Sequence, residues 1–236
     1  MASSPSSTPS QVKIHCKGVL FDMDGILVSS MDSVERSWTK WAELHGVGAE
    51  HTIKIMHGRR AIDTIAMLAP HLDPEVELKV IEDLEVEDNE GLSVLPGVLD
   101  LLSALTPNDG GLPRWTVVTS ATERLARVRM AIGGIPIPER LITADFVTRG
   151  KPHPEPFLAG AALLGIPPAD CVVFEDSASG ALAGREAGCT VVATTFSHTV
   201  ESLDAAHYLV EDLTGMKVTL LPGNQGLTLS FIPLAR

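Results

Sequence analysis

Short apolar runs that alternate with helical patterns constrain the fold of this chain more than any other feature. After residue 95, three apolar, β-branched runs are typical of buried strands: WTVVTS (115–120), CVVFED (171–176) and TVVAT (190–194). Between them lie helical patterns at 122–132, 154–164 and 178–187 and a further short strand, LITA (141–144). Strands that alternate with amphipathic helices predict βαβ crossovers, and therefore an α/β fold whose parallel sheet is covered on both faces.

A long helical insertion separates the first strand from the others. The run GVLFDMDGIL ends in acidic residues and a glycine, whereas residues 31–94 carry helical patterns and no convincing strand. We therefore predict an α/β core from residues 12–30 and 95–236, and a helical cap from residues 31–94 at the sheet edge where such folds bind ligands. The segments KVTLL and LTLSFI, joined by PGNQG, predict a C-terminal β-hairpin that extends an edge of the sheet.

Charge and composition exclude several classes of protein. With 18 Lys and Arg against 30 Asp and Glu, the net charge is −12, so we expect neither nucleic acid nor a membrane surface as a partner. No apolar run reaches the roughly 18 residues of a spanning helix. Three cysteines without a CxxC motif favour a reducing, cytoplasmic location, and the Ser- and Pro-rich residues 1–11 are expected to form a disordered tail. We also expect a monomer.

Two acidic residues follow the first strand. Asp22 and Asp24 are two residues apart, so their carboxylates tend to face the same side of an extended chain at the ligand-binding edge. One can act as a nucleophile and the other as a general acid or base. An acidic turn that ends the strand, with Gly25 supplying a permissive backbone, is the alternative interpretation.

Two further positions offer groups that can bind phosphate. At Ser120 and Ala121, a hydroxyl and the exposed amides of a helix start can hold a phosphate oxygen, but Ser120 could equally cap that helix. Lys151 is a compact cation suited to a phosphoryl group, although most lysines are solvated surface residues.

Two adjacent acids end the very apolar strand CVVFED. Buried carboxylates are costly unless they are paired or bind a metal, so Glu175 and Asp176 indicate a Mg²⁺ site with hard oxygen ligands. Capping of the next helix by Asp176 or Ser177 is the alternative interpretation.

The order of these groups along the chain favours the functional interpretation. With h for an apolar residue and x for any residue, the groups read hhhDxDG, hhh(S/T), K-P and hhhEDSxxG. In this order they resemble the motifs of the haloacid dehalogenase-like superfamily of phosphotransferases, from residue 17 to about 195. The resemblance implies a Rossmann-like core with a cap of the C1 type. The segments HGRRAIDTIAMLAP, GKPHPEPF and VVFEDSASGALAGREAGC look like those of sugar- and polyol-phosphate phosphatases. That branch includes 2-deoxyglucose-6-phosphate and glycerol-3-phosphate phosphatases, with the β-phosphoglucomutases as neighbours.

The resemblance implies a role for each matching residue. Asp22 would form an aspartyl-phosphate that water hydrolyses, and Asp24 would protonate the leaving alkoxide and then deprotonate that water. Mg²⁺ would be bound by the carboxylates of Asp22 and Asp176 and the backbone carbonyl of Asp24, with Glu175 in support. The phosphoryl oxygens would be bound by Ser120, Ala121 and Lys151.

The cap segment supplies the expected substrate contacts. His57, Arg59 and Arg60 match the part of the cap that faces the substrate in relatives, and arginine suits hydroxyls and phosphate oxygens. A buried, hydrogen-bonded histidine and a solvated helix end are the alternatives. Ile26 and Ser29 depart from the family pattern, which commonly has Thr and Asp there, so we expect altered turn contacts and cap hinging with the chemistry retained.

The resemblance leaves more than one activity open. We expect a Mg²⁺-dependent phosphatase of small sugar or polyol phosphomonoesters, and a phosphosugar mutase with the same site is the nearest alternative. Asp24 disfavours a haloalkanoate dehalogenase, and only Lys54 could form the Schiff base of a phosphonoacetaldehyde hydrolase. A regulatory binding module with a vestigial site is disfavoured by the intact set of site residues.

Overall fold

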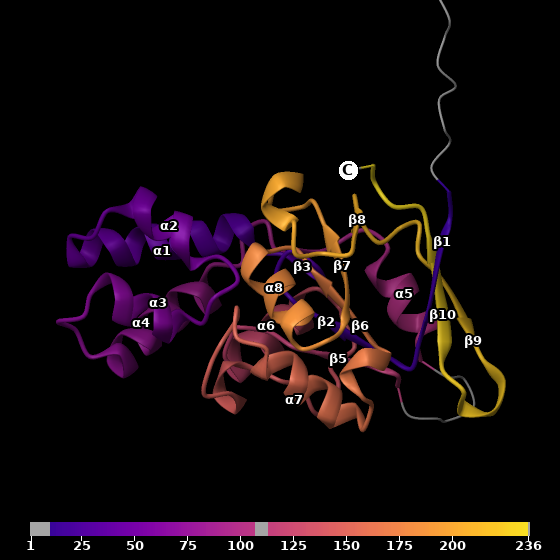
Figure 1. Ribbon diagram of the computed structural model, residues 1–236. Coiled ribbons are helices and arrows are strands. Elements are labelled where there is room, and N and C mark those ends of the chain that lie inside the picture. The colour runs from indigo at the N-terminus through magenta and orange to yellow at the C-terminus, as the bar shows by residue number, and fades with distance from the viewer. Residues whose placement is uncertain (1–9, 107–112, 236) are drawn as a thin grey trace, which may run out of the picture.

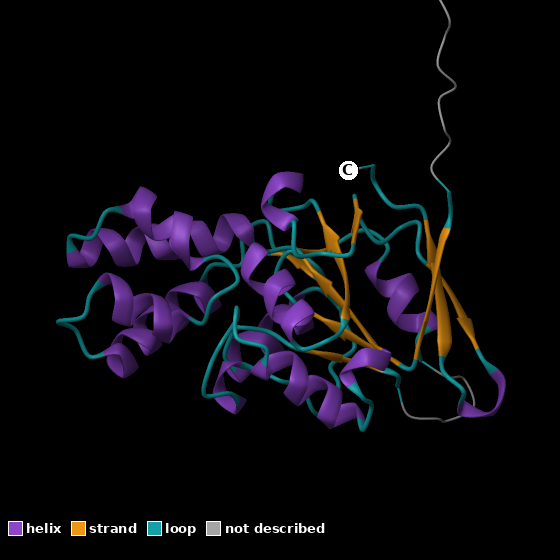
Figure 2. Ribbon diagram, in the orientation of Figure 1, coloured by secondary structure: helices purple, strands orange, loops and turns teal. Residues whose placement is uncertain are grey.

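A parallel sheet forms the centre of the molecule in the computed structural model, which describes residues 10–106 and 113–235 (Figures 1 and 2). In sheet order its strands are β5 (Trp115–Val117), β2 (Gly18–Phe21), β6 (Cys171–Glu175), β7 (Thr190–Thr194) and β8 (Tyr208–Val210). Every pairing in this sheet is parallel, and Phe21 lies between Val117 and Phe174. The predicted parallel core is confirmed, but the strand expected at residues 141–144 is reduced to one bridge, between Val118 and Ile142.

Alternating side chains divide the core into two halves. In β2, Val19 and Phe21 face one side of the sheet and Leu20 the other, because successive residues of a strand point to opposite faces. Helices α5 (Val98–Ala104) and α6 (Glu123–Ile132) pack on the Phe21 side. Helices α7 (Glu155–Leu164) and α8 (Ala178–Glu186) pack on the Leu20 side. Both faces of the sheet are therefore buried, and the polar residues after its strands face the cap.

The cap consists of α1 (Met31–His45), α2 (Ala49–Met56), α3 (Ala61–Leu68) and α4 (Pro74–Glu87). Figure 1 shows these helices as a lobe of their own at one end of the molecule. They enclose a separate hydrophobic core that includes Trp38, Trp41 and Ile81. The two connections to the sheet pair as short strands, β3 (Val28–Ser29) and β4 (Ser93–Val94), so the chain enters and leaves the cap side by side.

The C-terminal hairpin is present but does not extend the parallel sheet. Its strands β9 (Lys217–Leu220) and β10 (Leu227–Phe231) join β1 (Val12–Cys16) in a separate antiparallel sheet, at the opposite end from the cap (Figure 1). β10 lies in the middle of that sheet and buries Leu227, Leu229 and Phe231 in the core on the Phe21 side. The expected edge position was wrong because β1, whose half-polar sequence VKIHC carries little apolar signal, supplies the partner strand.

Short 3-10 helices occupy several connections: η1 (Ala144–Phe146), η2 (Pro168–Asp170), η3 (Val200–Leu203) and η4 (Pro222–Asn224). Among the described residues, no helix is both long enough and apolar enough to cross a membrane. All three cysteines are buried and unpaired. Most of the expected N-terminal tail, residues 1–9, lies outside the described residues.

Candidate active site

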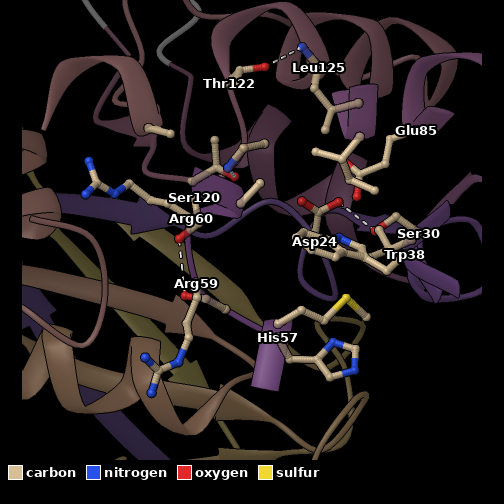
Figure 3. Close-up of a pocket in the computed structure, with 18 of the residues that line it drawn as sticks. Asp24, Ser30, Trp38, His57, Arg59, Arg60, Glu85, Ser120, Thr122 and Leu125 are labelled. Atoms are coloured by element: carbon tan, nitrogen blue, oxygen red, sulfur yellow. Dashed lines mark hydrogen bonds between the residues drawn. The ribbon is translucent and has the colours of Figure 1, made fainter. Parts of the chain in front are cut away.

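Residues that follow neighbouring strands meet at the edge of the sheet that faces the cap. Asp22 follows β2, Ser120 lies shortly after β5, and Asp176 follows β6. These residues and Asp24 line the core side of a cavity of about 320 Å³, and side chains of α1, α2, α3 and α4 line its cap side. Figure 3 shows Asp24 and Ser120 of the core with Trp38 and Glu85 of the cap. The cavity therefore lies between the core and the cap. Its volume is near the lower end of the roughly 300–1,000 Å³ typical of small-molecule sites.

Lys151 connects two of the strand ends. Its ammonium nitrogen lies 2.8 Å from Oδ1 of Asp22 and 2.7 Å from Oε1 of Glu175, and its side chain is buried. Burial opposes the charge of Lys151, but the two adjacent carboxylates outweigh that effect and raise its pKa. The position excludes the interpretation of Lys151 as a solvated surface residue.

Glu175 is held by its neighbours. Its Oε2 accepts hydrogen bonds from the amides of Asp176 and Ser177 and from the Ser177 hydroxyl. Burial acts to raise the pKa of Glu175, but Lys151 and the Ser177 donors lower it on balance. Ser177 also caps α8 by accepting a hydrogen bond from the Gly180 amide at 3.0 Å, so the Asp176 carboxylate is not needed as the cap.

Three buried carboxylates form a site that fits a divalent cation. One oxygen from each of Asp22, Glu175 and Asp176 lies within 4.8 Å of the other two. Burial, against the opposing effect of Lys151, raises the pKa of Asp22 to about 7, and burial with the adjacent negative charges raises the pKa of Asp176 well above its usual value. Lys151 supplies one positive charge against these three carboxylates. Hard oxygen ligands and an excess of negative charge are the conditions that suit Mg²⁺.

Asp24 points to a different set of partners. Its Oδ1 accepts a hydrogen bond from Ser30 Oγ at 2.6 Å (Figure 3). The same oxygen pairs with Arg129 Nη1 at 2.9 Å. Its carboxylate is not part of the acidic cluster among the described residues. Gly25 follows with φ 79°, where a side chain would overlap the Asp176 carboxylate. Glycine therefore lets this loop lie directly against the acidic cluster.

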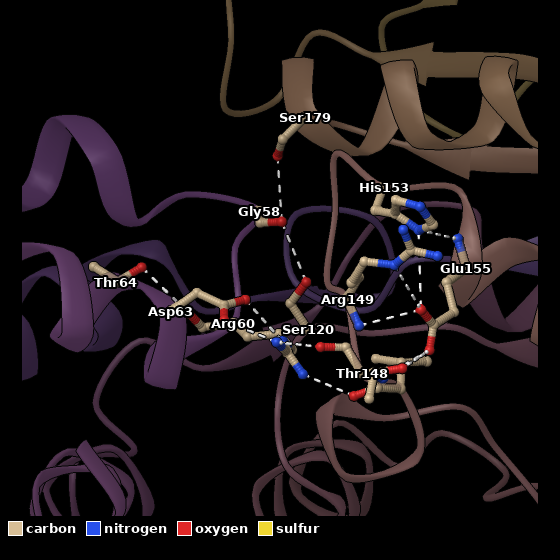
Figure 4. A network of polar contacts seen from close by, with 11 residues as sticks. Gly58, Arg60, Asp63, Thr64, Ser120, Thr148, Arg149, His153, Glu155 and Ser179 are labelled. Carbon is tan, nitrogen blue, oxygen red and sulfur yellow. Dashed lines mark hydrogen bonds and ion pairs between the residues drawn. The ribbon is translucent and has the colours of Figure 1, made fainter. Parts of the chain in front are cut away.

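Ser120 faces the cap rather than capping the following helix. Thr122 is the N-cap of α6 and accepts from the Leu125 amide at 3.3 Å, which excludes that alternative for Ser120. The Ser120 hydroxyl donates instead to the Gly58 carbonyl of the cap at 3.2 Å (Figure 4). The Ala121 amide donates to Thr119 Oγ1 at 3.1 Å, so a phosphate bound there would replace this bond.

His57 and Arg59 reach the cavity from the segment after α2. The half-buried His57 ring packs edge-to-face on His198 of the core, with 5.9 Å between ring centroids. Burial lowers the pKa of both imidazoles, and each ring also lines the cavity. Arg59 lines the cavity as well and is exposed to solvent.

Arg60 ties the cap to the core. Its Nε and Nη2 each lie 2.8 Å from Asp63, while Nη1 and Nη2 donate to the carbonyls of Val147 and Thr148 at 2.7 and 2.8 Å (Figure 4). The side chain is therefore neither a solvated helix end nor free to bind a ligand. A substrate contact would require Arg60 to exchange these bonds.

Other cavity residues belong to no motif. Ser30, Glu85, Arg129 and His198 line the cavity, and Ser197 bonds both Asp176 and the His198 ring. Arg129 alone leaves a signal in the sequence, because it interrupts the buried face of α6 formed by Leu125, Ala126 and Met130. A charge on such a face indicates a buried partner but does not identify it.

Comparison with known proteins gives a family model, two similar proteins and a similar solved structure. The family model described as haloacid dehalogenase-like hydrolase matches residues 16–188. Hexitol phosphatase A of Escherichia coli is 40% identical over 212 residues, covering 89% of this chain and 97% of that protein. Glycerol-1-phosphate phosphohydrolase 1 of Saccharomyces cerevisiae is 37% identical over 204 residues, covering 81% of this chain and 79% of that protein. A solved structure described as a putative β-phosphoglucomutase from Bacteroides vulgatus has a TM-score of 0.69 at 31% identity, covering 85% and 86%.

Proposed function

Because the chain belongs to the haloacid dehalogenase-like hydrolases, we propose that it is a Mg²⁺-dependent phosphatase of small sugar or polyol phosphomonoesters. The observation that carries this proposal is that Asp22 and Asp176 line a cavity between core and cap, while the buried ammonium of Lys151 lies 2.8 Å from Asp22. A nucleophile, a cation for the phosphoryl group and an acidic metal site are the parts that phosphoryl transfer requires. The similarity to a hexitol phosphatase and a glycerol-1-phosphate phosphohydrolase supports the substrate class.

The acidic cluster would hold Mg²⁺ through the carboxylates of Asp22 and Asp176 and the backbone carbonyl of Asp24. When bound, the ion offsets the repulsion between the nucleophile and a dianionic phosphoryl group. Glu175 supports this arrangement because its 2.7 Å ion pair holds Lys151 beside Asp22.

Asp22 and Asp24 divide the chemistry between them. The Asp22 carboxylate attacks phosphorus, the bond from phosphorus to the ester oxygen breaks, and an aspartyl-phosphate forms. Asp24 donates a proton to the leaving alkoxide and then takes one from the water that hydrolyses the aspartyl-phosphate, which releases inorganic phosphate. Lys151 and Ser120 bind the phosphoryl oxygens, and Ser120 gives up its hydrogen bond to Gly58 to do so.

The cap wall of the cavity favours a neutral, hydroxylated leaving group. It combines apolar side chains of α2, α3 and α4 with the carboxylates of Glu75, Glu82 and Glu85. Carboxylates accept hydrogen bonds from hydroxyl groups. Arg59 lines the same side of the cavity, so the cap offers both acceptors and a donor to a hydroxylated leaving group.

Replacement of the nucleophile tests the reaction. Asp22→Asn keeps the size of the side chain but removes its nucleophilic charge, so Mg²⁺-dependent phosphate release from an aryl phosphate should fall at least about 1,000-fold. Asp170→Asn is the matched control, because it breaks a 2.8 Å Asp–Lys ion pair on the surface and should keep the activity. A folded Asp22→Asn protein with more than about 1% of wild-type turnover would remove Asp22 from this role.

A further inference from the structure

Arg129 is a buried charge that the chemistry above does not use. It projects from α6 of the core, and its side chain is only 3% exposed. Its Nη1 lies 2.9 Å from Oδ1 of Asp24, and its Nη2 lies 3.7 Å from Oε2 of Glu85 on cap helix α4. The Nε and Nη2 atoms have no hydrogen-bond partner among the described residues. A buried guanidinium with unsatisfied donors is destabilising, so its place beside Asp24 calls for a functional explanation.

Among the described residues, the side-chain hydrogen bonds of Asp24 go to one of its two oxygens. Ser30, just before α1, and Arg129, in core helix α6, both donate a hydrogen bond to Oδ1. Two donors on one oxygen fix the rotation of the carboxylate, and they leave Oδ2 as the oxygen that can exchange a proton. Both partners are charged in the pair with Arg129, whereas only the acceptor is charged in the bond from Ser30, so Arg129 adds a direct charge–charge attraction that Ser30 lacks.

Glu85 is the cap residue that faces the guanidinium of Arg129. Its carboxylate is buried and faces Arg129 across the boundary between α4 and α6. The 3.7 Å separation is too long for a hydrogen bond, but a small approach of α4 would complete one with the unpaired Nη2. The guanidinium thus lies between a carboxylate of the core and a carboxylate of the cap.

We propose that Arg129 is a positioning residue that orients Asp24 for proton transfer, and that Glu85 secures Arg129 when the cap lies on the core. The inference rests on the proposed acid and base role of Asp24. It assigns to the core helix α6 a contribution to the reaction, in addition to the residues that follow the strands. It also explains why a charge interrupts the apolar face of that helix.

Arg124 distinguishes a positioning role from a purely structural one. It lies on the same helix and pairs with Glu82 and Asp83 of the same cap helix, at 2.7 and 2.6 Å. Its side chain is half exposed, and it is not among the residues that line the cavity. An arginine that only joins cap to core should therefore behave like Arg124.

The test compares kcat/KM, with Mg²⁺ present, for p-nitrophenyl, phenyl and glycerol phosphates, whose leaving groups become progressively more basic. In Arg129→Met, kcat/KM should fall at least about 100-fold for glycerol phosphate and less than about 10-fold for p-nitrophenyl phosphate. The reason is that only a basic leaving group needs the proton from Asp24. Arg129→Lys keeps the charge and should recover part of the loss. Arg124→Met should change kcat/KM by the same factor for all three substrates.

Equal losses of Arg129→Met on all three esters would overturn the inference. If Arg129→Met does not fold, Arg129→Lys and Glu85→Gln carry the same comparison, and an unchanged dependence on the leaving group in both would overturn it. A failure of the proposed function is seen separately, in Asp24→Asn. If that variant shows no loss selective for glycerol phosphate, Asp24 is not the acid and the positioning role falls with it.

Discussion

One lysine organises the candidate active site at the scale of single residues. Lys151 is buried and pairs with both Asp22 and Glu175, where ion pairs are stronger than at the surface because the surroundings are less polarisable. Loss of one partner from such a buried pair leaves an uncompensated charge. Loss of Lys151 would therefore leave two buried carboxylates uncompensated, and in the proposed function the same ammonium binds the phosphoryl group.

The metal ligands give a prediction at this scale. Asp176→Ala removes a carboxylate from the acidic cluster and should raise the Mg²⁺ concentration for half-maximal activity at least about tenfold. Added Mg²⁺ should also raise the unfolding temperature of this variant less than that of the wild type, a readout that needs no substrate. Asp204→Ala, at an exposed position, is the control. Full activity in excess chelator, or an unchanged Mg²⁺ requirement in Asp176→Ala, would refute the assignment.

Sequence reasoning at this scale succeeded where residues follow strands. Asp22, Ser120 and Asp176 could be placed together because the carboxyl ends of parallel strands meet at one edge. The core contacts of Arg60 could not be predicted, because they depend on how the cap packs on the core. The pair of Arg129 with Asp24 joins residues far apart in the sequence, so no local pattern predicts it either. No local pattern indicates that the donors of Arg60 are taken by the carbonyls of Val147 and Thr148.

At the scale of elements, the two connections to the cap are closely tied to the site. Ile26, one departure from the family pattern, is buried in the core, and Ser29, the other, lies in β3 opposite Ser93. The next residue, Ser30, ends this connection and binds Asp24. Altered cap hinging at these positions stays a prediction, but this connection is joined to the proposed acid by the Ser30 hydrogen bond and by a backbone bridge between Asp24 and Val28.

The C-terminal strand β10 shows what element-level prediction misses. The alternation of Leu227, Leu229 and Phe231 predicts a strand with one buried face, and that face packs into the core. The alternation cannot identify the neighbouring strand, because pairing with β1 joins segments from opposite ends of the chain. Local patterns therefore predicted the strand but not its sheet.

A core substitution tests the contribution of this sheet. Phe231 is 2% exposed and packs edge-to-face on Tyr208, with 5.7 Å between ring centroids. Phe231→Ala should lower the free energy of unfolding in urea by about 3–5 kcal/mol, with KM unchanged, because it leaves a cavity far from the site. Phe146→Ala, at a phenylalanine that is 60% exposed, should cost less than about 1 kcal/mol. A similar small effect at Phe231 would show that the antiparallel sheet does not support the core.

Across the whole molecule, the cavity depends on contact between two lobes. The Gly58 carbonyl of the cap accepts hydrogen bonds from Ser120 and Ser179 of the core, at 3.2 Å each (Figure 4). Together with Arg60, these bonds hold the cap over the strand ends. A cap that closes in this way excludes water and large substrates from the nucleophile.

The three unpaired cysteines fit a reducing compartment, while a cytoplasmic location and a monomeric state stay predictions.

The central claim is tested most directly by the initial rate of Mg²⁺-dependent phosphate release from a panel of phosphomonoesters. The panel should contain polyol, hexose and deoxyhexose phosphates, nucleotides and phosphopeptides, without any added sugar bisphosphate. We predict the highest kcat/KM for the polyol and sugar phosphates, because the cap side of the cavity offers polar groups that can hydrogen-bond hydroxyl groups. A panel led by nucleotides or phosphopeptides, or turnover that requires a bisphosphate and releases no phosphate, would contradict the proposed function.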